Sequence, residues 1–279
     1  MILHRLRILG LLGLQDLDVT FEHPVTVVTG GPASGKTTLL LAIVSAVEQL
    51  SPSGAQGIEL FSDPPKTGVK VGFSFHIEGQ PPIDAEIIAD SPMHIEFENP
   101  RNVTQVFAWN HNRRLVLLHE NRHIDPTPGA PTTSMLREPT SRKHVGIAQF
   151  LSEIAADAEA TEQFQLGLSA VCPSLRLLRV TRPGEVASFT RDGEEVSFTV
   201  LTDSERAAIV LVAEVLRSAT GESLVLIDTI ERSIAPSAVE ALLAALPRIS
   251  PRAQFLVTTR LDAVPGAHQR LHLTRPRRS

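Results

Sequence analysis

The chain has 279 residues, 42% of them hydrophobic and 20% charged, which is enough to bury a core as one domain with insertions or as two small ones. This composition excludes an intrinsically disordered or collagen-like chain. The net charge of -5 and the absence of tyrosine argue against a dedicated nucleic-acid coat, although nucleic acid stays a conceivable partner through a local basic patch.

Cys172 is the single cysteine of the sequence, so no disulfide forms within the chain, and we expect a cytoplasmic location. The apolar start of the chain is interrupted by Arg5 and Arg7, which is typical of strands rather than of a signal peptide. No stretch reaches the roughly 18 apolar residues of a membrane span. We therefore expect no membrane span.

The first fifty or so residues predict strands followed by a helix. Residues 2–8 and 17–21 alternate apolar and polar side chains, as half-buried strands do, and 25–29 is a β-branched run. Residues 37–50 then show helical periodicity. The resulting unit is a strand, a glycine-rich loop and a helix.

The middle of the chain is less regular. Residues 51–68 and 126–140 are rich in turn-forming residues and predict loops. Between and after them the pattern predicts strands at 69–77, 93–97, 175–180 and 186–190, a hairpin of 104–109 with 114–118, and a helical stretch within 145–168.

The last third alternates helices with buried strands. The expected elements are a helix at 204–219, a strand at 223–227, a helix at 238–246 and a strand at 254–258. Such alternation predicts an α/β fold with a mainly parallel sheet that is covered on both faces.

The strongest motif is a P-loop (Walker A), G-x-x-x-x-G-K-[ST], between the third strand and the first helix. It consists of Gly30, Gly31, Pro32, Ala33, Ser34, Gly35, Lys36 and Thr37, with Thr38 next on the helix. Its backbone N–H groups would surround two phosphates, Lys36 would bind the β- and γ-phosphates, and Thr37 would offer its hydroxyl to Mg²⁺. The motif predicts ATP and Mg²⁺ as ligands.

A P-loop site also needs an acidic residue at the end of another strand to hold the metal. The apolar run 224–227 ends in Asp228. We therefore predict that Thr37 and Asp228 hold Mg²⁺ together.

With both motifs placed, the chain resembles the ABC-type ATPase heads of the RecF and SMC group, including the small AAA-like ATPases of bacterial defence and repair loci. The opening hairpin up to Gly30 resembles that group's approach to its P-loop, and the likeness resumes at 189–193. Residues 201–206 are similar to the signature L-S-x-G-E/Q, 227–236 to D-E-P-E-x-x-L-H-P, and 254–260 to the last strand and switch, which usually ends T-T-H.

This resemblance implies a single ABC-type ATPase domain over 1–279, with an antiparallel β portion at its N-terminus. Residues 1–58 would form the P-loop half and 189–279 the half with the signature and Walker B motifs, with 59–188 as an inserted β/α subdomain. Two heads, identical or different, would pack head to tail around nucleotide. Thr202 and Ser204 would then approach the γ-phosphate of ATP on the other head.

The sequence departs from the family mainly at residues that hydrolysis needs. Thr229 occupies the position of the catalytic glutamate and Arg260 that of the switch histidine. A positioned general base typically contributes about 10²- to 10⁴-fold, and threonine cannot act as a carboxylate base. Glu231, at the family's second glutamate position, is a candidate replacement, and Arg260 could contact phosphate as an arginine finger does.

Other departures affect binding positions. Ser204 replaces the signature glycine, Pro32 and Ala33 replace an asparagine-glycine pair, Leu12 replaces the arginine of the hairpin, and Ala235 replaces the histidine before Pro236. The sequence thus predicts an ATP-binding protein that dimerises around nucleotide to regulate a partner, with slow or impaired hydrolysis.

Two other functions compete with this prediction. A non-hydrolysing scaffold in a defence or repair complex would keep the fold and lose the turnover. A P-loop kinase or GTPase would need an acceptor site or a guanine-reading N-K-x-D motif, and the sequence contains no N-K-x-D.

Residues 119–123 spell H-E-x-x-H, the pattern of zinc proteases. Zinc binding by this pattern requires a helix that places both histidines on one face. The preceding residues predict a strand, and Pro126 ends any helix within a turn. We therefore interpret the match as a coincidence.

Overall fold

The computed structural model describes residues 2–11, 14–49, 69–76, 83–89, 94–97, 115–118, 147–178, 188–218, 222–262, 264–266 and 268–275. Leu12, residues 104–109 and residues 119–123 lie outside these ranges, so the predictions made for them remain predictions.

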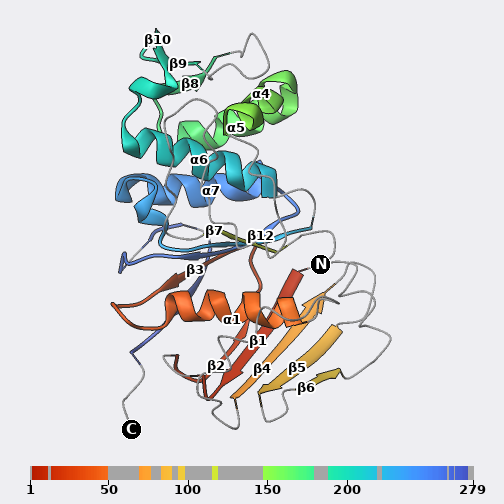
Figure 1. The fold of residues 1–279 in the computed structure, drawn as a ribbon. Helices are drawn as coiled ribbons and strands as arrows, with labels where there is room; N and C mark the ends of the chain where they lie inside the picture. Colours follow the sequence, from red (N-terminus) through yellow and green to blue (C-terminus); the bar gives the residue numbers. More distant parts are fainter. Residues whose placement is uncertain are drawn as a thin grey trace.

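A parallel five-stranded sheet crosses the middle of the molecule (Figure 1). Its spatial order is β13 (Gln269–His272), β3 (Val25–Thr29), β12 (Gln254–Thr258), β11 (Leu224–Ile227) and β7 (Leu115–Leu118), and each neighbouring pair is parallel. Every residue of β3, β11 and β12 is buried. Burial on both faces explains why these strands are rich in consecutive apolar residues, and it confirms the α/β prediction.

An antiparallel sheet lies on one side of the parallel sheet (Figure 1). Its order is β2 (Leu17–Thr20), β1 (Ile2–Leu9), β4 (Val69–His76), β5 (Ile83–Ala89) and β6 (His94–Phe97). In β1, Leu6 and Ile8 are buried while Arg5 and Arg7 are exposed, as the alternation predicted. The predicted N-terminal antiparallel portion is thereby confirmed.

Helices cover both faces of the parallel sheet. Helix α1 (Lys36–Gln49) lies between the two sheets, and the opposite face carries a layered stack of helices (Figure 1). The stack consists of α4 (Ile147–Ala156), α5 (Ala158–Val171), α6 (Asp203–Ser218) and α7 (Val239–Ile249). A small antiparallel sheet beyond the stack contains β8 (Leu175–Leu177), β9 (Ser188–Arg191) and β10 (Glu194–Ser197).

Several sequence expectations change in the structure. The helical stretch at 145–168 is two helices, because the Asp157 carboxylate accepts hydrogen bonds from the N–H groups of Glu159 and Ala160 and caps α5. Strand β7 pairs in parallel with β11, a pairing that the sequence had not indicated, while its expected hairpin partner at 104–109 lies outside the described residues. Strands β5, β10 and β13 had not been expected; β10 and β13 are four residues long and partly exposed, and such strands give a weak apolar signal.

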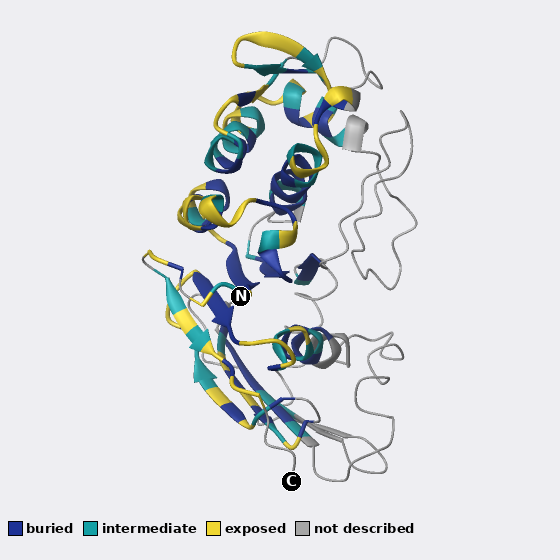
Figure 2. Ribbon diagram, turned by 90° about the vertical axis from the view of Figure 1, so that its left-hand side faces the viewer, coloured by how far each residue is buried: buried dark blue, intermediate teal, exposed yellow. Residues whose placement is uncertain are grey.

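Two hydrophobic cores lie on the two faces of the parallel sheet (Figure 2). Successive residues of a strand serve different cores: Val27 packs in the core with the helical stack, and Val28 packs in the core with α1 and the antiparallel sheet. In the part of the chain that the structure describes, no helix is long and apolar enough to cross a membrane.

A buried glutamine joins the two sheets. The Gln254 side-chain oxygen accepts from Leu3 N–H at 2.9 Å, and its NH₂ group donates to Leu3 C=O at 2.9 Å. Gln254 and Leu3 are each 1% exposed, so water cannot replace either bond. The first strand of the chain is thus attached to the centre of the parallel sheet.

Replacing this glutamine should weaken the fold measurably. In Gln254→Leu, the Leu3 N–H and C=O groups lose their partners, and we expect the free energy of unfolding to fall by about 2–4 kcal/mol. Gln163→Leu, which removes a 3.3 Å hydrogen bond on the exposed face of α5, should change it by no more than about 0.5 kcal/mol. Urea unfolding of both variants checks this, and equal midpoints would contradict the bridging role.

Candidate functional site

The loop after β3 has the shape of a phosphate cradle. Gly30 has φ +148°, and a Cβ atom there would lie 2.4 Å from Leu273 O and 2.6 Å from Ser34 Oγ. A side chain at this position would therefore displace the end of β13 or the loop itself. Gly35 has φ +91° and precedes α1, whose N-terminal N–H groups face the loop.

The middle of the loop carries a departure from the family pattern. Ala33 takes the place of the glycine in the usual asparagine-glycine pair, and it has φ +57°. The left-handed conformation costs a non-glycine residue about 1–2 kcal/mol. Gly31, Pro32 and Ala33 are exposed, whereas Ser34 is buried. The loop thus keeps the P-loop backbone shape despite an unfavourable residue.

Lys36 holds its ammonium group over the loop. Its Nζ donates to Gly30 C=O at 2.5 Å and to Gly31 C=O at 3.1 Å, and it lies 3.5 Å from Ser34 Oγ. The pKa of Lys36 is lowered, mainly because the ammonium group is partly buried. The carboxylates of Glu231 and Asp228 oppose this shift, and the Arg260 cation adds to it. Three charged side chains predicted for the site therefore act on this one ammonium group.

Asp228 joins the loop to the neighbouring strands. Its side chain is buried, with the residue 1% exposed. Thr37 donates its hydroxyl to Asp228 Oδ2 at 2.9 Å, and Thr258 donates to Oδ1 at 2.6 Å. A hydroxyl and a carboxylate oxygen are hard ligands that fit Mg²⁺, which commonly takes one or two protein oxygens together with phosphates and water.

Thr229 occupies a strained turn directly after Asp228. It has φ +47° and ψ +67°, a left-handed conformation that is rare for a β-branched residue. Its N–H donates to Thr258 Oγ1 at 2.7 Å, and its hydroxyl lies 3.4 Å from Asp228 Oδ1. Thr258 was not among the predicted site residues, although the T-T pair at the switch marks its position.

Glu231 and Arg260 meet at the ends of β11 and β12. The N–H of Arg260 donates to Glu231 Oε1 at 2.8 Å. Glu231 Oε2 is buried and has no hydrogen-bond partner among the described residues. The structure therefore brings both residues to the P-loop edge of the sheet, together with Asp228 and Thr229.

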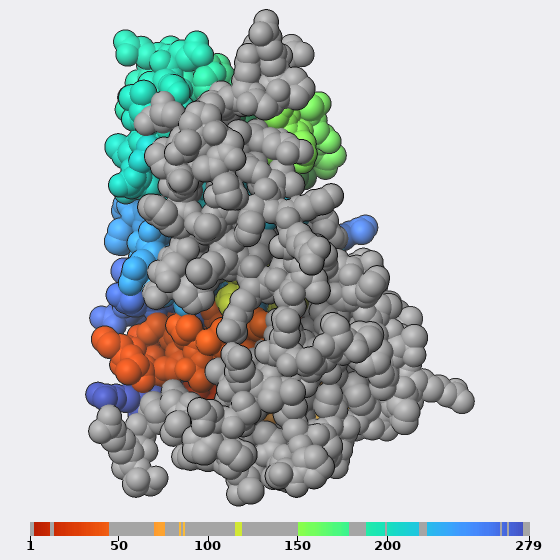
Figure 3. Space-filling view, viewed as in Figure 1, coloured from red at the N-terminus to blue at the C-terminus, as the bar shows by residue number. Residues whose placement is uncertain are grey.

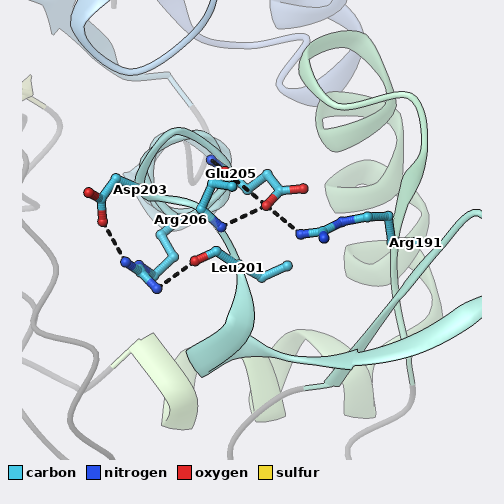
Figure 4. A network of polar contacts seen from close by, with 6 residues as sticks. Arg191, Leu201, Asp203, Glu205 and Arg206 are labelled. Atoms are coloured by element: carbon cyan, nitrogen blue, oxygen red, sulfur yellow. Dashed lines mark hydrogen bonds and ion pairs between the residues drawn. The ribbon is translucent and has the colours of Figure 1, made fainter.

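The start of α6 is organised by a reciprocal cap between Thr202 and Glu205, and Figure 4 shows Glu205 together with Arg191, which contacts it. Thr202 N–H donates to Glu205 Oε2 at 2.8 Å, and Glu205 N–H donates to Thr202 Oγ1 at 3.3 Å. Arg191 reaches from the β9–β10 hairpin to the same Glu205 oxygen at 2.6 Å. Burial would raise the pKa of Glu205, but the bonds from Thr202 and the Arg191 cation outweigh it and lower that pKa.

The P-loop and the start of α6 lie on the same side of the molecule. Because α6 leads directly into β11, it runs opposite to that strand, and its first residues lie towards the edge at which β3 and β11 end. Figure 1 shows α1 and α6 beginning on the left-hand side, and Figure 3 shows orange and teal atoms reaching the surface there. Thr202 and Ser204 are exposed on this side and do not belong to the cluster around Lys36.

A family model described as an AAA domain matches residues 5–166, more than half of the chain, and the chain belongs to this family. No curated protein matches the sequence. Together with the match to this AAA family, the fold is that of an ABC-type ATPase head, as seen in solved SMC heads.

Solved SMC heads share the fold over nearly their whole length. A Smc head bound to the C-winged helix domain of ScpA has a TM-score of 0.63 at 13% identity, covering 94% of this chain and 91% of that chain. The Thermotoga maritima SMC head has a TM-score of 0.56 at 15% identity, with 94% and 90% covered. A Smc head with an extended coiled coil, bound to the C-terminal domain of ScpA derived from Pyrococcus furiosus, has 0.57 at 12%, with 93% and 90% covered.

Removing the Thr258 hydroxyl should destabilise this edge of the sheet. In Thr258→Val, Thr229 N–H loses its partner and Asp228 loses its shortest hydrogen bond, so we expect about 2–4 kcal/mol of destabilisation. Thr258→Ser keeps the hydroxyl and should lose no more than about 1 kcal/mol. Chemical unfolding distinguishes them, and a valine variant as stable as the serine variant would show that the hydroxyl has no such role.

Proposed function

We propose that this protein binds ATP and Mg²⁺ in its P-loop, dimerises head to tail around the nucleotide and thereby regulates a partner, while hydrolysing ATP slowly. The observation that supports this best is the cluster of Lys36, Thr37 and Asp228, in which an ammonium, a hydroxyl and a carboxylate converge beside a glycine-lined loop. These groups match the charges and oxygens of a magnesium-bound triphosphate.

Each part of the cluster has a separate proposed role. The backbone N–H groups from Gly30 to Thr38 receive the phosphate oxygens, and Lys36 contacts the β- and γ-phosphates. Thr37 and Asp228 hold Mg²⁺, which neutralises the charge that develops on the phosphates. The short bond from Thr37 to Asp228 supports this pairing, because it already places the two ligands side by side.

The start of α6 is the proposed contact with the second head. Thr202 and Ser204 are exposed at the N-terminus of a long helix whose first turn is stabilised by Glu205 and Arg191. Helix N-termini attract anions. In a head-to-tail dimer, formed with a second copy of this chain or with a different head, these residues approach the γ-phosphate on the other subunit.

Slow hydrolysis follows from the residues around the γ-phosphate position. Thr229 has no carboxylate and its hydroxyl faces Asp228, so it cannot accept a proton as the family's glutamate does. Arg260 replaces the switch histidine and could contact phosphate instead. We propose that the ATP-bound dimer therefore persists long enough to act on a partner protein.

The proposed domain organisation has one head over 1–279, in which 1–58 and 189–279 supply the nucleotide-binding residues and 59–188 is inserted between them. The described middle elements support a single domain, because β4 pairs with β1 and β7 pairs with β11. The solved Smc heads are bound to domains of ScpA, and by analogy we propose that this chain also acts with a protein partner.

Lys36→Ala should weaken ATP binding by about 10- to 100-fold, since a hydrogen bond to a charged group contributes about 1.5–3 kcal/mol. Calorimetric titration with ATP and Mg²⁺ measures this. Lys70→Ala is the matched control, because Lys70 lies in the antiparallel sheet and pairs with Glu86 at 3.5 Å. Unchanged affinity in Lys36→Ala would rule out the proposed phosphate site.

Ser204→Arg should prevent ATP-dependent dimerisation while leaving the ATP affinity of the monomer unchanged, because the added side chain occupies the space proposed for the other head's γ-phosphate and lies away from the chain's own P-loop. Light scattering after size exclusion should show the 30.3 kDa wild type doubling its mass with ATP and Mg²⁺, and the variant remaining a monomer. Ser174→Arg, at an exposed turn before β8, should dimerise normally. A wild type that stays monomeric with ATP would contradict the proposed dimer.

A further inference from the structure

We propose that Glu231 is the catalytic residue that accepts the proton of the attacking water, in place of the glutamate missing at position 229. This inference rests on the proposed function, because it requires ATP to be bound in the P-loop.

The backbone after β11 presents position 231 to the site. Thr229 takes the left-handed conformation, and the chain then forms the short helix η2 (Ile230–Arg232). Ile230 is fully buried in the core on the helical side and anchors this turn. Glu231, the next residue, is half-buried at the end of the sheet, where it accepts a hydrogen bond from Arg260, the second residue after β12.

The two carboxylate oxygens of Glu231 have different surroundings. Arg260 N–H holds Oε1 at 2.8 Å, which fixes the orientation of the carboxylate. Oε2 is buried without a hydrogen-bond partner among the described residues. A buried carboxylate oxygen without a hydrogen-bond partner lowers the stability of the fold by about 1–3 kcal/mol or more. At a ligand site, such an oxygen therefore indicates that the ligand or a bound water donates the missing hydrogen bond. Water bound beside a γ-phosphate is such a donor.

The charges near Glu231 support the same assignment. Among the nearby carboxylates, Glu231 raises the pKa of the Lys36 ammonium more than Asp228 does. Asp228 has both of its oxygens engaged by threonine hydroxyls and is the proposed metal ligand. Glu231 is therefore the carboxylate near Lys36 that still has an oxygen available for proton transfer.

The proposed step is the hydrolysis of ATP, in which atoms and charges balance. The water oxygen forms a bond to the γ-phosphorus, and the bond from that phosphorus to the bridging oxygen breaks, so that ADP leaves with the electron pair. The proton of the water passes to Glu231 Oε2 and then to solvent. The products are ADP and inorganic phosphate, and no further reactant is needed.

A purely structural role is the competing explanation, because Glu231 also holds the loop that begins at Arg260. Glu231→Gln separates the two roles: the amide oxygen can still accept from Arg260 N–H, whereas the amide cannot accept a proton at neutral pH. Glu240→Gln, which removes an exposed carboxylate on α7, is the matched control for the lost charge.

The experiment measures single-turnover hydrolysis with excess protein, the nucleotide that remains bound, and the lifetime of the ATP-dependent dimer. In Glu231→Gln we expect ATP affinity and thermal midpoint to match the wild type and hydrolysis to fall at least about 10²-fold. The bound nucleotide should remain ATP, and the dimer should persist longer. Glu240→Gln should behave as the wild type in all three measurements.

Three results would overturn the inference: Glu231→Gln hydrolysing ATP as fast as the wild type, wild-type hydrolysis no faster than that of Lys36→Ala, or a lowered melting midpoint that accounts for lost turnover. None of these removes ATP binding by the wild type, so they are distinct from a failure of the proposed function. As a second variant, Thr229→Glu in the Glu231→Gln background should restore turnover if the lost group is a general base. Failure of this variant to hydrolyse, while it still binds ATP, would also count against the inference.

Discussion

The carboxylate of Asp228 is the point on which the site depends. One of its oxygens accepts from Thr37 at the start of α1, and the other accepts from Thr258 at the end of β12. Asp228 itself follows β11, so one buried charged group joins three segments that are far apart in the chain. Removing one hydrogen-bond partner of a buried charged group greatly lowers the stability of the fold. The contacts of Asp228 therefore both stabilise the fold and favour this one arrangement of the three segments.

The parallel sheet explains why these segments meet. Strands β3, β12 and β11 are consecutive neighbours and run in the same direction, so the P-loop, the switch residues and Asp228 all emerge at one edge. Ligands commonly bind outside the carboxyl ends of parallel strands. Thr229 and Arg260, two of the residues that differ from the family pattern, lie at the same edge and follow β11 and β12 without interrupting the parallel pairing of these strands.

Residues that differ from the family pattern lie beside the groups proposed to bind nucleotide. Lys36, Thr37 and Asp228 carry the ammonium, hydroxyl and carboxylate proposed to bind a magnesium-bound triphosphate, whereas the Thr229 hydroxyl lies close to Asp228. Ala33 and Thr229 both adopt left-handed conformations that are unfavourable for their side chains. Other contacts offset the cost of this conformation at Thr229. Ile230 is buried in the core, and Thr258 forms hydrogen bonds with Thr229 and Asp228.

The amino-acid sequence by itself determined the α/β class, the buried strands and the P-loop, because continuous apolar runs and a glycine-rich loop before a helix are local patterns. It also placed Asp228 at the end of a buried strand and a helix over 204–219, close to the observed α6. Only the tertiary structure decided that Thr258 holds Asp228, that β7 pairs with β11 and β13 with β3, and that Glu231 meets Arg260. These contacts join residues about 30 or more positions apart, and such pairings depend on strand order, which no local pattern encodes.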